Sequence, residues 1–201
     1  AGNKPLYNTT ENTLRVRGVL QADFPIYRGC ETSMVSTLLP SRHAVIHGTR
    51  TKVEGMKEDV NMHTDFLDLP ASKGEVEKEN AVFFYVKTLM ESDGDITIVP
   101  VGPMTNLAMA MRVEPKICSK IKEIVLMGGG YNRTNTSSAA EFNIWFDPEA
   151  AQIVMESGVP IRMVPLDATH QACINTDEVK KLQAMGNPSA AAAASFIAHR
   201  I

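Results

Sequence analysis

Apolar residues along the chain alternate between helical and strand spacing. A first helix is predicted to be capped by Asn8 or Thr9 and to end before Asp23, and a short strand is predicted over residues 25–27. After a long polar stretch, helices and short apolar runs then follow one another in a regular order. The predicted helices cover residues 79–91, 105–112, 148–157, 177–185 and 189 onward, and the predicted strands cover 96–101, 124–127 and 161–166.

This alternation is typical of an α/β fold. Short apolar runs flanked by helices indicate buried parallel strands, so we predict an open, mostly parallel sheet with flanking helices. At 201 residues the chain has the size of one generous domain, and we predict a single domain over residues 1–201.

Composition narrows the function classes. Apolar residues make up 44% and charged residues 21%, as in soluble globular domains, and the net charge of −3 makes nucleic acid an unexpected partner. Neither a signal peptide nor a membrane span is expected. The cysteines Cys30, Cys118 and Cys173 are odd in number and form no CxxC spacing, which predicts reduced, buried thiols and a cytoplasmic protein.

Polar or glycine-rich segments follow the predicted strands, at residues 102–106, 128–130 and 167–170. In open α/β sheets ligands bind beyond the carboxyl ends of the strands, so these segments are candidate site residues. The glycines at 128–130 form either a tight turn or a close approach to a ligand. They match neither a dinucleotide site nor a phosphate loop.

The densest group of polar candidates lies in residues 135–149. Glu141 and Asn143 offer a carboxylate and an amide two positions apart, a set that suits a vicinal diol. Asp147, directly before Pro148, is predicted to cap a helix. We find no such capping explanation for Glu141.

Four segments resemble the inosine-uridine-preferring nucleoside hydrolase family, in the family's order. They are IVPVGPMTN at 98–106, VLMGGG at 125–130, AEFN and DPEAA within 140–151, and VPLDATHQ at 164–171. The resemblance implies hydrolysis of the N-glycosidic bond of ribonucleosides, in nucleoside salvage, by a homo-oligomer that binds Ca²⁺.

The resemblance also implies roles for particular residues. The Val101 carbonyl would bind the metal, and His47 would lie near the base. Ribose hydroxyls would be held by Asn3, Asn135, Glu141 and Asn143, and the sugar pocket would be lined by Met127 and Phe142. Judged from the residues alone, Met127 also fits a core position, His47 a turn and His170 a structural role.

The chain departs from the family pattern in three places. The family's Asp-rich first strand, central in its sheet, and its later His-Asp pair do not occur here, so we expect an incomplete sheet and no catalytic residue in residues 1–201. Residues 49–77 are polar and are expected to form an insertion or a mobile flap. The alternatives are a catalytically silent remnant that binds nucleosides weakly or pairs with a relative, and an unrelated α/β protein that binds a small sugar.

Overall fold

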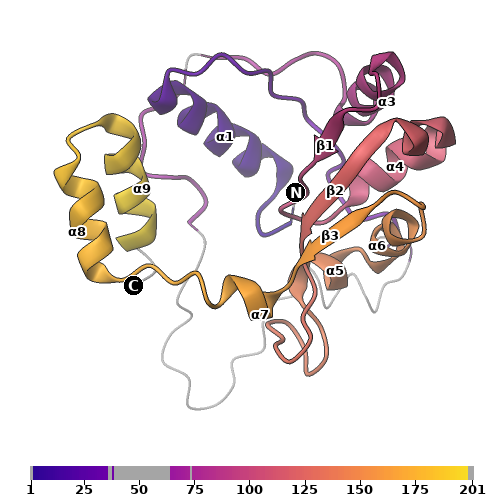
Figure 1. The fold of residues 1–201 in the computed structure, drawn as a ribbon. Coiled ribbons are helices and arrows are strands. Elements are labelled where there is room, and N and C mark those ends of the chain that lie inside the picture. Colours follow the sequence, from indigo (N-terminus) through magenta and orange to yellow (C-terminus); the bar gives the residue numbers. More distant parts are fainter. Residues whose placement is uncertain (1, 36–37, 39–63, 73, 199–201) are drawn as a thin grey trace. The chain divides into compact units, whose positions relative to one another are not determined.

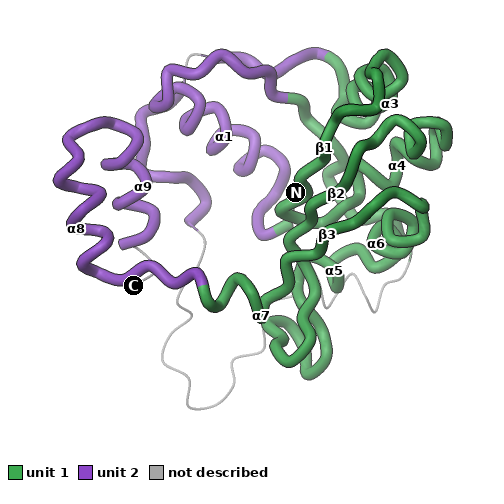
Figure 2. The backbone as a smooth tube through the Cα atoms, viewed as in Figure 1, with its two compact units in different colours: residues 1–2, 27–49, 79–171 green, residues 3–26, 50–78, 172–201 purple. Residues whose placement is uncertain are grey.

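The computed structural model describes residues 2–35, 38, 64–72 and 74–198, which form two compact units (Figure 2). The chain passes between the units several times. Unit 1 takes Ala1–Gly2, Tyr27–Thr49 and Glu79–Gln171, and unit 2 takes Asn3–Ile26, Arg50–Lys78 and Ala172–Ile201. The single domain over residues 1–201 therefore stays a prediction.

Unit 1 contains the predicted sheet. Its elements are α3 (Ala81–Glu91), β1 (Ile96–Ile98), α4 (Thr105–Val113), the 3₁₀ helix η2 (Pro115–Lys120), β2 (Ile121–Met127), α5 (Phe142–Phe146), α6 (Pro148–Met155), β3 (Ile161–Val164) and α7 (Leu166–Thr169). The strands lie in the order β1-β2-β3, and both pairs are parallel (Figure 1). The α/β class and the parallel sheet are confirmed.

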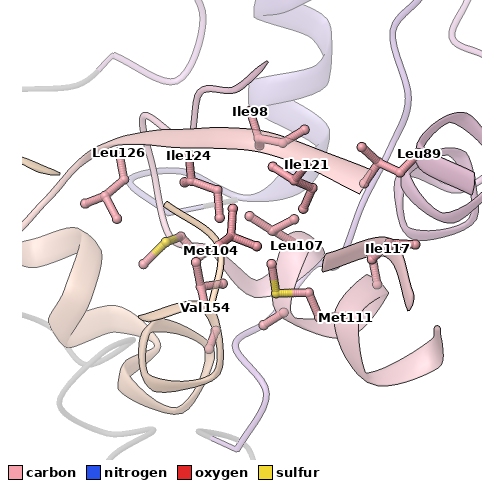
Figure 3. Close-up of a cluster of buried hydrophobic side chains, with 14 of the residues drawn as sticks. Leu89, Ile98, Met104, Leu107, Met111, Ile117, Ile121, Ile124, Leu126 and Val154 are labelled. Carbon is pink, nitrogen blue, oxygen red and sulfur yellow. The ribbon is translucent and has the colours of Figure 1, made fainter. Parts of the chain in front are cut away.

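The core of unit 1 lies between β2 and the helices on one face of the sheet. Ile124 and Leu126 alternate along β2 and are 0% and 1% exposed, and they point toward Leu107 of α4 and Val154 of α6 (Figure 3). Burying one such side chain stabilises a fold by about 1.5–3 kcal/mol. The close packing of β2 against these helices therefore fixes the position of the strand's carboxyl end.

Side chains that cap the N-terminus mark the starts of α3 and α6. The Asn80 side chain accepts a hydrogen bond from the Val82 N–H at 2.9 Å and caps α3. Asp147 caps α6 by accepting from the Ala150 N–H at 3.1 Å, with Pro148 at the first helical position. The predicted capping role of Asp147 is confirmed.

Unit 2 contains α1 (Leu6–Leu20), α8 (Thr176–Ala184) and α9 (Pro188–Ala198). The predicted start of the first helix is wrong, because α1 begins at Leu6 after Pro5. The fixed φ of proline suits a helix start, and the hydroxyls of Thr9 and Thr10 bond back to the Leu6 carbonyl at 3.0 and 2.6 Å instead of capping.

Residues 64–72 are bound to α1 within unit 2. The Arg15 Nη1 donates to the carbonyls of Leu67 and Leu69 at 3.0 and 3.3 Å, and the Leu67 N–H donates to Asn12 at 2.8 Å. Residues 49–63 of the predicted flap lie outside the described residues, so the flap stays a prediction.

Four further predictions need correction. The run predicted as strand 96–101 forms β1 only over Ile96–Ile98. No strand forms over residues 25–27, because the Ile26 carbonyl accepts from the Glu77 N–H at 2.8 Å and the segment has no strand partner among the described residues. The run predicted as strand 161–166 ends at Val164, and α7 begins at Leu166. Cys173 is exposed, so the prediction of a buried thiol is wrong there.

No helix within the described ranges is both long and apolar enough to cross a membrane.

Candidate functional site

The segments that follow the three strands meet at one edge of the sheet in unit 1 (Figure 1). The Met127 N–H donates to the Pro100 carbonyl at 2.9 Å, and the Gly128 N–H donates to the Val164 carbonyl at 3.3 Å. Parallel pairing thus continues to the points where the polar segments begin. The strand ends place the predicted site segments next to one another.

Glu141 is the buried carboxylate of this edge, at 4% exposed. Its Oε2 accepts hydrogen bonds from the backbone N–H groups of Gly129 at 2.9 Å, Asn143 at 2.9 Å and Ile144 at 3.2 Å. Glu141 is therefore the N-cap of α5, and our sequence interpretation that it has no capping explanation is wrong. Sequence did not reveal α5, because the helix has only five residues.

The second oxygen of the Glu141 carboxylate has a different environment. Among the described residues, no hydrogen bond reaches Oε1. Glu141 also lines a cavity of about 420 Å³. The carboxylate is therefore fixed by one oxygen and able to accept a hydrogen bond with the other.

Asn143 connects α5 to the end of β2. Its Nδ2 donates to the Met127 carbonyl at 3.1 Å and contacts the Met127 sulfur at 3.2 Å. In the described part of the chain, no hydrogen bond reaches Asn143 Oδ1. The amide is thus held in a fixed orientation with its acceptor oxygen available.

Asn135 joins the same group through the loop between β2 and α5. Its Oδ1 accepts from the Phe142 N–H at 2.8 Å, and its own N–H donates to the Ala140 carbonyl at 3.2 Å. The structure therefore brings five predicted site residues together. They are Met127, Asn135, Glu141, Phe142 and Asn143.

The other predicted site residues are not part of this described group. Asn3 is exposed and belongs to unit 2, directly after Gly2. His47 lies outside the described residues. Val101 lies three residues after the end of β1 at Ile98 and is 75% exposed.

The glycines at 128–130 leave little space for side chains. Gly129 has φ +69°, a left-handed conformation that favours glycine, and its carbonyl accepts from the Leu166 N–H at 3.0 Å. A Cβ on Gly130 would collide with the carbonyl oxygen of Arg133. The sequence left open a tight turn or a close approach to a ligand, and both interpretations stay predictions.

The polar residues of the GPMTN segment hold the fold together. Thr105 Oγ1 donates to Asp147 Oδ2 at 2.6 Å, and Asn106 Oδ1 accepts from the Cys30 N–H at 2.7 Å. Asp147 is 0% exposed and also accepts from the Met34 N–H at 3.0 Å. These side chains therefore connect α4, the start of α6 and the segment at 30–34.

Asp167 is a candidate that the sequence placed in a polar segment without a role. Its Oδ2 accepts from the Tyr131 N–H at 2.7 Å and its Oδ1 from the Asn132 N–H at 3.0 Å. The backbone N–H groups of Tyr131 and then of Asn132 hold the pKa of this carboxyl below its ordinary value of 3.8. The sequence signal that could have indicated this role is an aspartate that follows a strand and lies in the first turn of a helix. His170, which we expected to be structural, lies nearby, with Nδ1 3.3 Å from Arg133 Nη1.

The cavity beside Glu141 is mainly apolar and only partly coincides with the predicted site. Of the five site residues that the structure brings together, Glu141 alone is among the lining residues, with Gly129 and Gly130 from the predicted glycine-rich segment. The lining residues are Gly129, Gly130, Ala139, Ala140, Glu141, Ile144, Trp145, Pro148, Met155 and Met163. We place the candidate site on the hydrogen-bonded group around Glu141, because the indole N–H of Trp145 is the one polar side-chain group that the cavity's other lining residues offer.

A calcium site of the kind that the resemblance implies needs a cage of six to eight oxygens, several from carboxylates. The described residues contain no group of three or more His, Cys, Asp or Glu side chains that could hold a metal ion. Val101 contributes at most one carbonyl. The described donor set therefore does not fit a Ca²⁺ site.

The fold is that of an α/β protein with an open parallel sheet, and the candidate site lies at the carboxyl ends of its strands. The model of the family described as inosine-uridine preferring nucleoside hydrolase matches residues 1–200. The chain belongs to this family, and the resemblance noted in the sequence is confirmed.

Relatives and solved structures agree with this assignment. The chain is 40% identical over 189 residues to the pyrimidine-specific ribonucleoside hydrolase RihB of Escherichia coli strain K12, covering 94% of this chain and 56% of that protein. It superposes on the purine-preferring ribonucleoside hydrolase of Gardnerella vaginalis with a TM-score of 0.81 and 29% identity, covering 100% of this chain and 61% of that one. A plant nucleoside hydrolase gives a TM-score of 0.72 and 28% identity, with 98% of this chain and 60% of that one covered. The chain thus spans 56% of the length of the curated relative.

Proposed function

We propose that this protein hydrolyses the N-glycosidic bond of ribonucleosides and releases ribose and the free base, in nucleoside salvage. The observation that carries the proposal is the fixed Glu141 carboxylate, whose Oε2 is held by three backbone N–H groups while Oε1 stays available beside a cavity. Membership of a nucleoside hydrolase family over residues 1–200 supports the same activity.

The group around Glu141 supplies what a ribose ring needs. Glu141 Oε1 and Asn143 Oδ1 would accept hydrogen bonds from ribose hydroxyls, and the Asn135 amide nitrogen would donate one. Met127 and Phe142 would cover the apolar parts of the sugar. Because backbone groups already hold these side chains, little ordering is needed when substrate binds.

The same fixed groups would act on the transition state. As the bond to the base breaks, the sugar becomes an oxocarbenium-like cation, and the polarity of its hydroxyls increases. Acceptors fixed at Glu141 and Asn143 then bind the hydroxyls more strongly than in the ground state, which lowers the barrier. Asn3 as a further ribose contact and His47 near the base complete the proposal.

The base class is part of the proposal. The relative at 40% identity is described as pyrimidine-specific, and the superposed bacterial enzyme as purine-preferring. The higher identity makes uridine and cytidine the first substrates to test, with inosine as the comparison.

Calcium is the cofactor that the resemblance implies. When bound, it supplies Lewis-acid activation of the attacking water. The described residues offer only the Val101 carbonyl toward it, so we assign none of the steps above to the metal.

The remaining parts of the proposal concern the setting. We propose a cytoplasmic homo-oligomer without nucleic-acid or membrane partners. Burial raises the pKa of the Cys30 and Cys118 thiols, which keeps them protonated and weakly reactive, as suits structural cysteines. The homo-oligomer rests on the family resemblance.

A second candidate function is a nucleoside-binding protein without catalysis. The observation that favours it is that the described residues contain no cluster of acidic side chains that could hold a metal ion. The unrelated sugar-binding protein is no longer a candidate, since the chain belongs to the hydrolase family.

The test measures ribose release by the protein expressed from its complete reading frame. Uridine, cytidine and inosine are supplied in turn, with Ca²⁺ and with a chelator, and nucleoside binding is measured in parallel by calorimetry. Ribose release supports the hydrolase, and binding without release supports the second candidate. If none of the three nucleosides is hydrolysed or bound, both candidate functions are excluded.

A further inference from the structure

The loop between β2 and α5, residues 128–141, carries Asn135 and is attached at several points within unit 1. Its base is fixed by the Glu141 carboxylate, which accepts from the Gly129 N–H at 2.9 Å. Its return arm is fixed by the Phe142 N–H, which donates to Asn135 at 2.8 Å. Both contacts lie inside the loop or at its ends.

The outgoing arm, residues 130–133, is held from outside the loop by α7. Asp167 accepts from the Tyr131 N–H at 2.7 Å and from the Asn132 N–H at 3.0 Å, with one carboxylate oxygen for each. Arg133 Nη1 lies 3.3 Å from Nδ1 of His170, the C-cap of α7, which gives a second contact to the same short helix. A Cβ on Gly130 would collide with the carbonyl oxygen of Arg133, so the two ends of this arm pack closely on each other.

We propose that Asp167 is a positioning residue of the nucleoside site, which holds Tyr131 and Asn132 and thereby sets the place of Asn135 three positions later. This inference rests on the proposed function, because Asn135 is a proposed ribose contact. Asp167 itself need not contact the substrate.

The chemistry of the contact explains why a carboxylate stands here. Two neighbouring N–H donors need two acceptor oxygens, and an ionised carboxylate offers both, with stronger hydrogen bonds than a neutral group. An asparagine would offer one oxygen and would direct an NH₂ group at the other donor. Asp167→Asn therefore removes one hydrogen bond while nearly preserving the size of the side chain.

A different role for Asp167 would be a favourable interaction of its charge with the dipole of α7, because Asp167 lies in the first turn of that helix. That role would make any first-turn aspartate equivalent. Asp177 is such a residue, exposed in the first turn of α8 in unit 2, with its Oδ1 bound to Lys180 Nζ at 3.0 Å. Asp177→Asn is therefore the matched control.

The experiment compares Asp167→Asn, Asp167→Ala and Asp177→Asn in the protein expressed from its complete reading frame. For Asp167→Asn we expect KM for the best nucleoside to rise about 5- to 10-fold with kcat within about twofold, since placement of a binding group is lost rather than chemistry. Asp167→Ala should raise KM further, and Asp177→Asn should leave both constants unchanged. Amide hydrogen exchange at Tyr131 and Asn132 should accelerate in the Asp167 variants alone.

Other results separate this inference from the proposed function. An active wild type whose KM does not change in either Asp167 variant overturns the positioning role and leaves the hydrolase intact. An equal KM increase in Asp177→Asn also overturns it, since the effect would then be one of charge. A wild type that neither binds nor hydrolyses nucleosides overturns the proposed function, and the positioning role with it.

Discussion

Thr105 and Asp147, at the starts of two helices, are joined by a buried hydrogen bond of 2.6 Å from Thr105 Oγ1 to Asp147 Oδ2. Thr105 is the first residue of α4, and Asp147 caps α6. Neither group faces solvent, because the two residues are 8% and 0% exposed. The bond joins the start of α4 to the start of α6, the two helices that pack against β2.

Removing this hydroxyl should destabilise the fold. Thr105→Val keeps the shape of the side chain but leaves a buried carboxylate with one donor fewer, and we expect a loss of about 1–3 kcal/mol in the free energy of unfolding. Urea denaturation measures it. Thr13→Val is the control, because Thr13 is exposed and bonds only within α1, to the Thr9 carbonyl, and its effect should stay below about 0.5 kcal/mol. Equal losses in the two variants would contradict the structural role of the bond.

Asn143→Ala should reduce catalysis more than stability. If Asn143 Oδ1 accepts from a ribose hydroxyl that becomes more polar in the transition state, its loss should raise the barrier by about 2–4 kcal/mol, visible in kcat as well as KM. Steady-state ribose release measures it. The control is Gln183→Ala, which removes an exposed amide from α8. Unchanged turnover in Asn143→Ala would show that the amide serves only to connect α5 to β2.

Glu141 should behave differently from Asn143. Its Oε2 caps α5, so Glu141→Ala should lower both the free energy of unfolding, by about 0.5–2 kcal/mol, and turnover. Comparing thermal unfolding with ribose release separates the two losses. A fully stable, inactive Glu141→Ala would show that the cap contributes little to the fold.

Protonation of Asp167 should release the outgoing arm of the loop. Because the pKa of the folded carboxyl is lowered, its stabilising contribution is complete above the ordinary value of 3.8 and is lost as the pH falls through the lower, folded-state pKa. The backbone amide shifts of Tyr131 and Asn132 in NMR spectra should therefore stay constant from neutral pH down to about 4 and then move together. Asp167→Asn should abolish this acid transition, and a transition that persists in the variant belongs to another group.

Residues 1–201 on their own should bind Ca²⁺ weakly. The Val101 carbonyl is one neutral ligand, and a tight site needs several carboxylates around the ion. Calcium titration by calorimetry is the measurement. A sub-micromolar dissociation constant would show that ligands exist beyond those we describe.

The sequence alone determined the fold class and most helix and strand positions of unit 1. Apolar runs such as 124–127 lie between helices with clear caps, and local spacing is sufficient to recognise that pattern. The capping role of Asp147 also followed from one neighbour, Pro148. Recognition of the family depended on motifs short enough to be read directly from the residues.

Only the tertiary structure decided what the polar residues of those motifs do. Glu141 caps α5 through the neighbouring N–H groups of Asn143 and Ile144, but only the fold brings Gly129, twelve positions earlier, to the same oxygen. Asp167 likewise accepts from Tyr131 across 36 positions. The segment at 25–27 fails to form a strand because pairing depends on a distant partner, which the local pattern does not specify. Local spacing sets secondary structure, whereas hydrogen bonds between distant segments assign each polar side chain to the fold or to the site.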